Sequence, residues 1–300
     1  MQTTSPAAKA FFDALDAAEK DDSSSTTIST STSKRKPQSD FVTKRIQTLG
    51  WRNRHSQDEW YPVKLKQPTT IEFSVRQVQR GEITGKYGTG ATVWPASVVL
   101  LKYLEKHQER FLHGKRVIDL GAGTGVTSIA AALCGARQVV CTDGEENVVR
   151  LARDNIMAVV ETGMANTDNQ PTADEESMED SASQLFSIHD ASVSVQKYWW
   201  GTGVIRGGNS CDLVIVSDCV LPKLYPIAPL VDALDQLLTT PESVAVVSYE
   251  HRYYPEYDPR DKFLELATAK SLGVETVPME EQDEVYSVDD IEIWLVQRKP

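Results

Sequence analysis

From Arg116 onward, short apolar runs alternate with longer amphipathic segments, and this alternation limits the folds that the chain can adopt. The runs VIDL, QVVCTD, ASVSVQ, CDLVIVSD and SVAVVSY have the length and the branched side chains of buried strands. The segments GVTSIAAALCG, ENVVRLARDNIMAVV, PLVDALDQLL and DKFLELATAK lie among them and have helical periodicity. Strands that alternate with helices predict a parallel sheet with helices on both faces.

The end of the chain breaks this pattern. VETVPMEEQDEVYSVDDIEIWLVQ contains two strand-like runs with no helix between them, which predicts a C-terminal antiparallel hairpin. We therefore expect an α/β fold with a seven-stranded sheet that is mostly parallel. Upstream, TTIEFSVRQ has the alternation of one further strand, GEITGKYGTGATVW is a glycine-rich loop, and Pro95 suits the first turn of a helix.

Two segments do not resemble folded core. Residues 1–40 contain the low-complexity run DDSSSTTISTSTSKRKP and predict a disordered or weakly helical extension. Residues 161–183 carry seven acidic side chains and no Lys or Arg, and we expect a disordered insert there. The remainder, residues 41–300, predicts one domain. The formal net charge is −12, but without the insert it is about −5. Most of the negative charge therefore lies in the insert, and it does not indicate a partner-binding surface.

The composition excludes several classes of protein. No run of 18 apolar residues could span a membrane, and the N-terminus lacks the pattern of a signal peptide. The four cysteines form no CxxC pair, which favours buried free thiols in a reducing compartment over disulfides or zinc. We expect a cytoplasmic monomer that binds neither nucleic acid nor membrane and holds no metal. Lys34-Arg35-Lys36 is either a nuclear address or a solvated charge cluster.

A glycine-rich turn joins the first of these strands to the following helix. Gly121, Gly123 and Gly125 follow VIDL, and Asp143 ends the next strand. The turn from a parallel strand into a helix is where α/β sheets bind ligands, and glycine lets the backbone approach a ligand closely. A carboxylate at the position of Asp143 can accept two hydrogen bonds from ribose hydroxyls.

The spacing of the glycines separates two classes of ligand. A dinucleotide site would need GxGxxG, but position 126 is Val126. The pattern here is D-x-G-x-G-x-G, which is typical of enzymes that use S-adenosylmethionine. It predicts cofactor contacts from Asp119, which would face the amino-acid moiety, and from Gly121, Ala122, Gly123, Gly125 and Asp143. A turn without ligand and a nicotinamide dinucleotide site are the alternatives.

Four further stretches carry a family resemblance: TVWPASVVLLKYL, YWWGTG, VSDCV and SYEHR. With the glycine turn, they resemble the class I seven-β-strand protein-lysine methyltransferases of the methyltransferase-like 21 group. The tail VPMEEQDEVYSVDDIEIWLVQRK is most similar to the subgroup that methylates the valosin-containing ATPase. The resemblance implies a Rossmann-like fold, S-adenosylmethionine as cofactor, and cofactor contacts from Trp94, Trp200 and Ser217.

The same resemblance implies the catalytic residues. Asp218 would face the substrate lysine, and Tyr249 would line the same channel. Structural alternatives are a helix N-cap for Asp218 and, for Tyr249 and its neighbour Glu250, hydrogen bonds with the two residues that follow them. The family has D-x-x-Y at this strand end, but this chain has Leu221 at the tyrosine position and its first tyrosine at Tyr225. Either Tyr225 takes over the role of the family tyrosine in the site, or this chain has lost that role.

These observations predict transfer of a methyl group from S-adenosylmethionine to a lysine of a protein substrate, with a AAA ATPase of the valosin-containing type as candidate. The nucleophile must be a neutral amine, and deprotonating a free lysine at pH 7 costs roughly 4–5 kcal/mol. Desolvation in an apolar channel lowers this cost. A small-molecule N-methyltransferase and a non-catalytic cofactor-binding scaffold are the alternatives.

Overall fold

The computed structural model describes residues 50–66, 69–78, 87–164, 185–207 and 211–299. The expected extension at 1–40 and residues 165–183 of the expected insert lie outside this part of the chain. The first residues of that insert form a single π-helical turn, Val160–Met164, that continues the helix before it.

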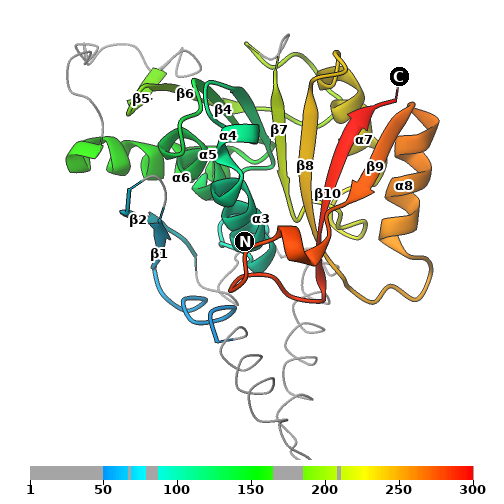
Figure 1. Ribbon diagram of the computed structural model, residues 1–300, viewed down its shortest axis with the longest axis horizontal. Coiled ribbons are helices and arrows are strands. Elements are labelled where there is room, and N and C mark those ends of the chain that lie inside the picture. The colour runs from blue at the N-terminus through cyan, green and yellow to red at the C-terminus, as the bar shows by residue number, and fades with distance from the viewer. Residues whose placement is uncertain (1–49, 67–68, 79–86, 165–184, 208–210, 300) are drawn as a thin grey trace, which may run out of the picture.

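Eight strands form the main sheet, in the order β5-β6-β4-β3-β7-β8-β10-β9 (Figure 1). In the chain they are β3 (Arg116–Leu120), β4 (Gln138–Asp143), β5 (Leu185–Ile188), β6 (Ala191–Lys197), β7 (Leu213–Ser217), β8 (Val244–Glu250), β9 (Leu272–Thr276) and β10 (Ile291–Arg298). Strands β6, β4, β3, β7 and β8 are mutually parallel, and β10 is antiparallel to both β8 and β9. The expected α/β class and the C-terminal antiparallel hairpin are confirmed.

The sheet has one strand more than expected. The additional strand, β5, pairs antiparallel with β6 at the edge of the sheet. Its four residues, LFSI, directly follow the acidic segment and are too few for the alternation of side chains to stand out.

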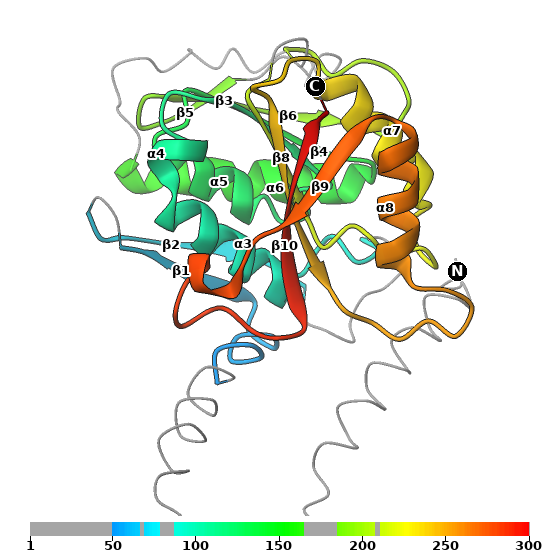
Figure 2. The ribbon, with the colours of Figure 1, turned by 45° about the vertical axis from the view of Figure 1, so that its right-hand side comes forward.

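Helices cover both faces of the sheet. Helices α3 (Pro95–Lys106), α5 (Val126–Leu133) and α6 (Glu146–Val159) pack on one face, and α7 (Ile227–Leu237) and α8 (Pro259–Ala269) pack on the other (Figures 1 and 2). Adjacent residues of β3 divide between the two cores: Val117 belongs to the first and Ile118 to the second. This division explains why the parallel strands are continuous apolar runs.

A separate two-stranded sheet lies against α6. Strands β1 (Trp60–Leu65) and β2 (Ile71–Arg76) pair antiparallel, and their inward side chains join the core that contains α3 and α5. The amide of Asn155, on α6, bonds both backbone groups of Arg76 at 2.7 and 3.0 Å and donates to the carbonyl of Thr124 at 2.9 Å. One buried side chain thus ties this hairpin to the glycine-rich turn.

All four cysteines are buried and free, as expected. Burial raises the pKa of the Cys134 thiol to about 12, so it stays protonated at neutral pH. Within the described ranges, every helix is too short or too polar to cross a bilayer.

Candidate functional site

A cavity of about 810 Å³, including the part open to solvent, lies at the carboxyl ends of the parallel strands. The turns after β3, β4, β6 and β7 form most of its wall, and residues 87–94 with the start of α3 close the other side. Ligands of open α/β sheets bind at this edge. The expected contacts that line the cavity are Trp94, Gly121, Ala122, Gly123, Asp143, Trp200, Ser217 and Asp218.

The first two glycines of the turn are required by its geometry. Gly121 and Gly123 have φ of 68° and 58°, in the left-handed region. A Cβ on Gly121 would lie 2.8 Å from the Cys219 sulfur, and one on Gly123 would lie 2.6 Å from the carbonyl oxygen of Gly90. The turn therefore brings bare backbone to the cavity, because a side chain at either position would collide with Cys219 or with Gly90. Gly125 is the N-cap of α5 and lies outside the cavity lining.

Asp143 ends β4 and holds its own turn in place. Its carboxylate accepts the backbone N–H of Gly123 at 3.1 Å and that of Glu145 at 3.1 Å. Burial raises its pKa, and these two backbone hydrogen bonds act in the opposite direction. The carboxylate faces the cavity with acceptor capacity left over, because each ionised oxygen can accept more than one hydrogen bond.

Asp119 lies elsewhere than expected. Its side chain is fully buried and accepts the hydroxyls of Thr127 and Ser128, on α5, at 2.6 and 2.7 Å. It is absent from the cavity lining, so it supports the strand-to-helix turn from behind. Among the described residues its second oxygen has no hydrogen-bond partner, and burial raises its pKa to about 6.

Aromatic side chains form the opposite wall of the cavity. The Trp94 indole N–H donates to the carbonyl of Thr89 at 2.9 Å, which fixes the ring at the start of α3. The rings of Trp200 and Tyr225 meet edge to face, with centroids 5.6 Å apart. The sequence favoured Trp200 of the pair YWWGTG, but Trp199 lines the cavity as well.

The end of β7 places two polar side chains beside this wall. The Ser217 hydroxyl is 2.6 Å from that of Ser97, on α3. Asp218 follows it with φ of 54°, an uncommon conformation for an aspartate, and is 6% exposed. The N-cap alternative for Asp218 is wrong, because the next helix begins at Ile227 with Pro226 as its N-cap.

Arg252 binds Asp218 in a two-pronged ion pair. The two guanidinium nitrogens lie 2.8 and 2.5 Å from the two carboxylate oxygens. The same guanidinium reaches the Glu250 carboxylate at 3.2 Å, and Glu250 is also paired with Arg52. Burial lowers the pKa of Arg252, but Asp218 and Glu250 outweigh this effect and the pKa is raised. Arg52 further bonds Asp290 at 2.7 Å, so the charges form a chain from Asp218 to the surface.

The turn after β7 places Tyr225 in the cavity lining. Leu221 is buried in the lining, at the position where the family pattern has tyrosine. Four residues later the Tyr225 hydroxyl lies 2.8 Å from that of Thr89, and its ring also lines the cavity. Burial raises the pKa of Tyr225, so its hydroxyl stays protonated.

Tyr249 lies outside the cavity, contrary to the expectation from sequence. It is 1% exposed and packs on Trp294 and His251, with ring centroids 4.9 and 5.1 Å away. Successive side chains of a strand point to opposite faces, so Tyr249 faces the core that contains α7 and α8. Its neighbour Glu250 contacts Arg252, as the structural alternative for this pair predicted.

The sequence did not single out several residues of the site. Tyr87, Thr89, Val148, Tyr198 and Cys219 line the cavity. Arg252 was expected only as a partner of Glu250 or Tyr249, and it also binds Asp218. Thr89 belongs to the glycine-rich stretch GKYGTG, and Arg252 belongs to SYEHR, so these stretches carried the only available signal. Among the described residues no group of three or more His, Cys, Asp or Glu could hold a metal ion.

Two family models match the chain. One, described as lysine methyltransferase, matches residues 164–270, and one described as ribosomal protein L11 methyltransferase matches residues 2–180. The chain is 32% identical to the protein N-lysine methyltransferase METTL21A of Xenopus tropicalis over 60% of this chain and 67% of that protein. It is 30% identical to the protein N-terminal and lysine N-methyltransferase EFM7 of Yarrowia lipolytica, over 63% of this chain.

The chain spans 64% of the Yarrowia protein, which is less than two thirds of that relative's length. A solved structure, a ribosomal protein L11 methylase from Lactobacillus delbrueckii subsp. bulgaricus, is similar with a TM-score of 0.44 and 16% identity. That similarity covers 68% of this chain and 80% of the other.

Proposed function

The chain belongs to the lysine methyltransferase family, and we propose that it transfers a methyl group from S-adenosylmethionine to a lysine side chain of a protein substrate. The observation that carries the proposal is the buried carboxylate of Asp218 at the edge of the cavity, next to Ser217 and the aromatic wall. This carboxylate can receive an ammonium group, and the apolar surroundings favour loss of its proton.

The residues of the cavity fit S-adenosylmethionine, the cofactor of these methyltransferases. Gly121 and Gly123 present bare backbone to the cavity, because a Cβ at either position would collide with its protein neighbours, and Asp143 offers a carboxylate for ribose hydroxyls. Trp94 and Trp200 supply flat apolar surface for the remainder. When bound, the cofactor supplies a methyl group on a positively charged sulfur, which is the electrophile of the reaction.

The chain's own residues then have three tasks. They bind and aim the amine, exclude water, and keep the amine neutral at the moment of attack, so that positioning supplies much of the rate. A carboxylate that aims an ammonium also stabilises its charged form, which opposes deprotonation. Arg252 reduces this opposition, because its bidentate ion pair offsets part of the negative charge of Asp218.

Tyr225 supports a catalytic function over the scaffold alternative. Its ring lies in the cavity lining in spite of Leu221 at the position of the family tyrosine.

The tail resemblance makes a AAA ATPase of the valosin-containing type the first candidate substrate. The disordered extension, the cytoplasmic location and the monomeric state stay predictions, as does the expected lack of nucleic acid, membrane and metal partners.

The test is transfer of labelled methyl groups to cell lysate by the purified chain, with Asp218→Asn as the variant and Asp154→Asn, on the exposed side of α6, as its control. A discrete protein band that the control retains and Asp218→Asn loses would support the proposal. Peptide mapping of the band must then place the label on a lysine side chain rather than on an N-terminal amine. Label confined to small molecules, or no transfer by a chain that still binds the cofactor in calorimetry, would refute it.

A further inference from the structure

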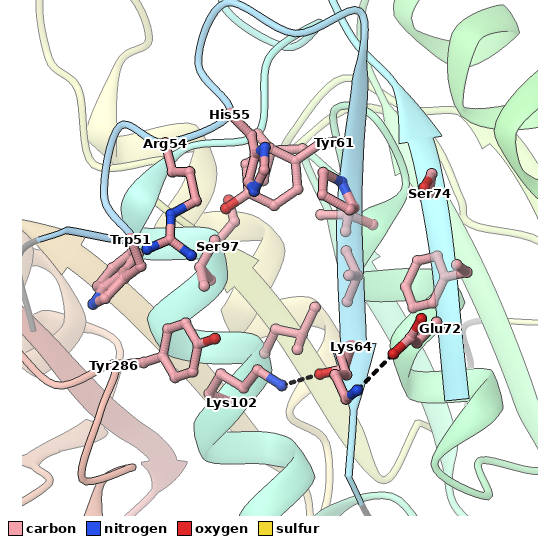
Figure 3. Close-up of a pocket in the computed structure, with 17 residues that line it drawn as sticks. Trp51, Arg54, His55, Tyr61, Lys64, Glu72, Ser74, Ser97, Lys102 and Tyr286 are labelled. Carbon is pink, nitrogen blue, oxygen red and sulfur yellow. Dashed lines mark hydrogen bonds and ion pairs between the residues drawn. The ribbon is translucent and has the colours of Figure 1, made fainter. Parts of the chain in front are cut away.

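A second cavity adjoins the one just described (Figure 3). It has a volume of about 1100 Å³, including its mouth to solvent, and lies between the β1–β2 hairpin, α3 and the segment that begins at Trp51. Ser97 and Val126 line both cavities, and the Ser97 hydroxyl bonds that of Ser217 in the first. The second cavity therefore lies beside the end of β7, where Ser217 and Asp218 are.

The charge of this cavity is opposite to that of the chain. Its lining contains three cationic side chains, Arg54, Lys64 and Lys102, and one carboxylate, Glu72, although the chain as a whole has a formal net charge of −12. Lys64 is paired with Glu72 at 2.6 Å, and Lys102 with Glu105 at 2.7 Å. Arg54 is exposed, and no acidic side chain of the described residues forms an ion pair with it. It is the cation that a ligand can engage.

The rest of the wall is apolar and aromatic. Trp51 and Tyr286 meet with ring centroids 5.2 Å apart, and Tyr61 and Phe73 contribute rings from the hairpin. Figure 3 shows Arg54 between Trp51 and Ser97, above the ring of Tyr286. Aromatic side chains beside one guanidinium suit a bulky apolar group that lies next to a carboxylate.

The wall of this cavity is also tied to the candidate catalytic group. Arg52, between Trp51 and Arg54 in the chain, is paired with Glu250. Glu250 in turn bonds Arg252, which holds Asp218. The segment that carries Arg54 is thus anchored to the residues around Asp218, so contacts at one site have a fixed position relative to the other.

We propose that this second cavity binds the stretch of the protein substrate that flanks the target lysine, and that it selects a bulky apolar residue next to an Asp or Glu whose carboxylate pairs with Arg54. The inference rests on the proposed function, since it assumes a polypeptide acceptor. It specifies which residues should flank the target lysine, and the fold alone does not specify them.

The experiment uses pools of peptides that have one central lysine, with Asp, Glu, Leu, Phe, Lys or Ala fixed in turn at each of the four positions on either side. Methyl transfer to each pool is measured for the full chain, for Arg54→Glu and for Tyr286→Ala. Arg110→Glu is the matched control, because Arg110 is exposed on the short helix α4 (Gln108–Phe111), lines neither cavity and carries the same change of charge. Cofactor affinity and melting temperature are recorded for every variant.

The full chain should prefer an acidic residue at one flanking position by about two- to fivefold, the factor that a partly exposed ion pair supplies. Arg54→Glu should reverse this preference in favour of Lys, Tyr286→Ala should weaken the preference for Leu and Phe, and Arg110→Glu should change neither. Equal transfer to all pools, or an acid preference that Arg54→Glu retains, would overturn the inference and leave the proposed function intact. Failure of the full chain to methylate any pool, with cofactor bound, would count against both.

Discussion

Arg252→Gln should destabilise the fold by about 3–5 kcal/mol, the range for removing one partner of a buried ion pair. The side chains of Arg252 and Asp218 are 11% and 3% exposed. The substitution removes both bonds to Asp218 and the contact with Glu250 at 3.2 Å. The buried carboxylate of Asp218 then faces the half-buried carboxylate of Glu250, with Arg52 as the remaining guanidinium that contacts Glu250.

Urea unfolding measures this loss as a lower midpoint at unchanged slope. Arg76→Gln is the matched control, because Arg76 and Glu59 form a pair at 3.1 Å whose side chains are more than half exposed. That variant should lose no more than about 1 kcal/mol. Adding Asp218→Asn to Arg252→Gln should recover part of the loss, since it removes the uncompensated charge. If Arg252→Gln costs as little as the control, the buried-pair argument is wrong.

Three further predictions concern the turn and its acids. Asp143→Ala should weaken S-adenosylmethionine binding by roughly 1–3 kcal/mol in calorimetry, because charge-assisted hydrogen bonds are lost; an unchanged affinity would remove Asp143 from the ribose site. Gly123→Ala should lower both cofactor affinity and melting temperature, whereas Gly114→Ala, also at positive φ but with open space around it, should show only the backbone strain; equal effects would exclude the clash with Gly90. Burial raises the pKa of Asp119 to about 6, above an unfolded value near 3.9, so its contribution to stability is full below about pH 4 and is lost as the pH rises through about 6. Relative to the wild type, the free energy of unfolding of Asp119→Asn should therefore rise by up to about 3 kcal/mol between pH 4 and pH 7 in urea titrations, and a flat difference would contradict the raised pKa.

The parallel part of the sheet could be predicted from the sequence because its strands are buried on both faces. Continuous apolar runs such as LVIVS in β7 mark such strands without ambiguity when helices separate them. The hairpin strand β1, WYPVKL, has a weaker signal, because its exposed residues include Trp60 and its third residue is proline. Edge strands tolerate proline, so composition did not mark this segment as a strand.

Residues of the site could be predicted where the ends of strands determine their positions. They were harder to predict where the orientation of a side chain depends on its tertiary contacts. Glycine spacing placed the turn and Asp143, since both follow from where strands end. Asp119 is in the same motif but turns toward α5, because two hydroxyls in the first turn of that helix donate hydrogen bonds to it. Tyr249 and Glu250 are adjacent in one strand, and strand alternation sends only one of them toward Asp218.

Tyr225 lines the cavity although it comes four residues after the position of the family tyrosine. With leucine at the expected place, a pattern comparison predicts either loss of the aromatic contact or its replacement. Between Cys219 and Tyr225 the chain makes a tight turn in which the backbone N–H groups of Leu224 and Tyr225 both bond the carbonyl of Leu221, at 2.9 and 2.8 Å. Four residues in such a turn bring Tyr225 back beside Leu221, so both line one cavity.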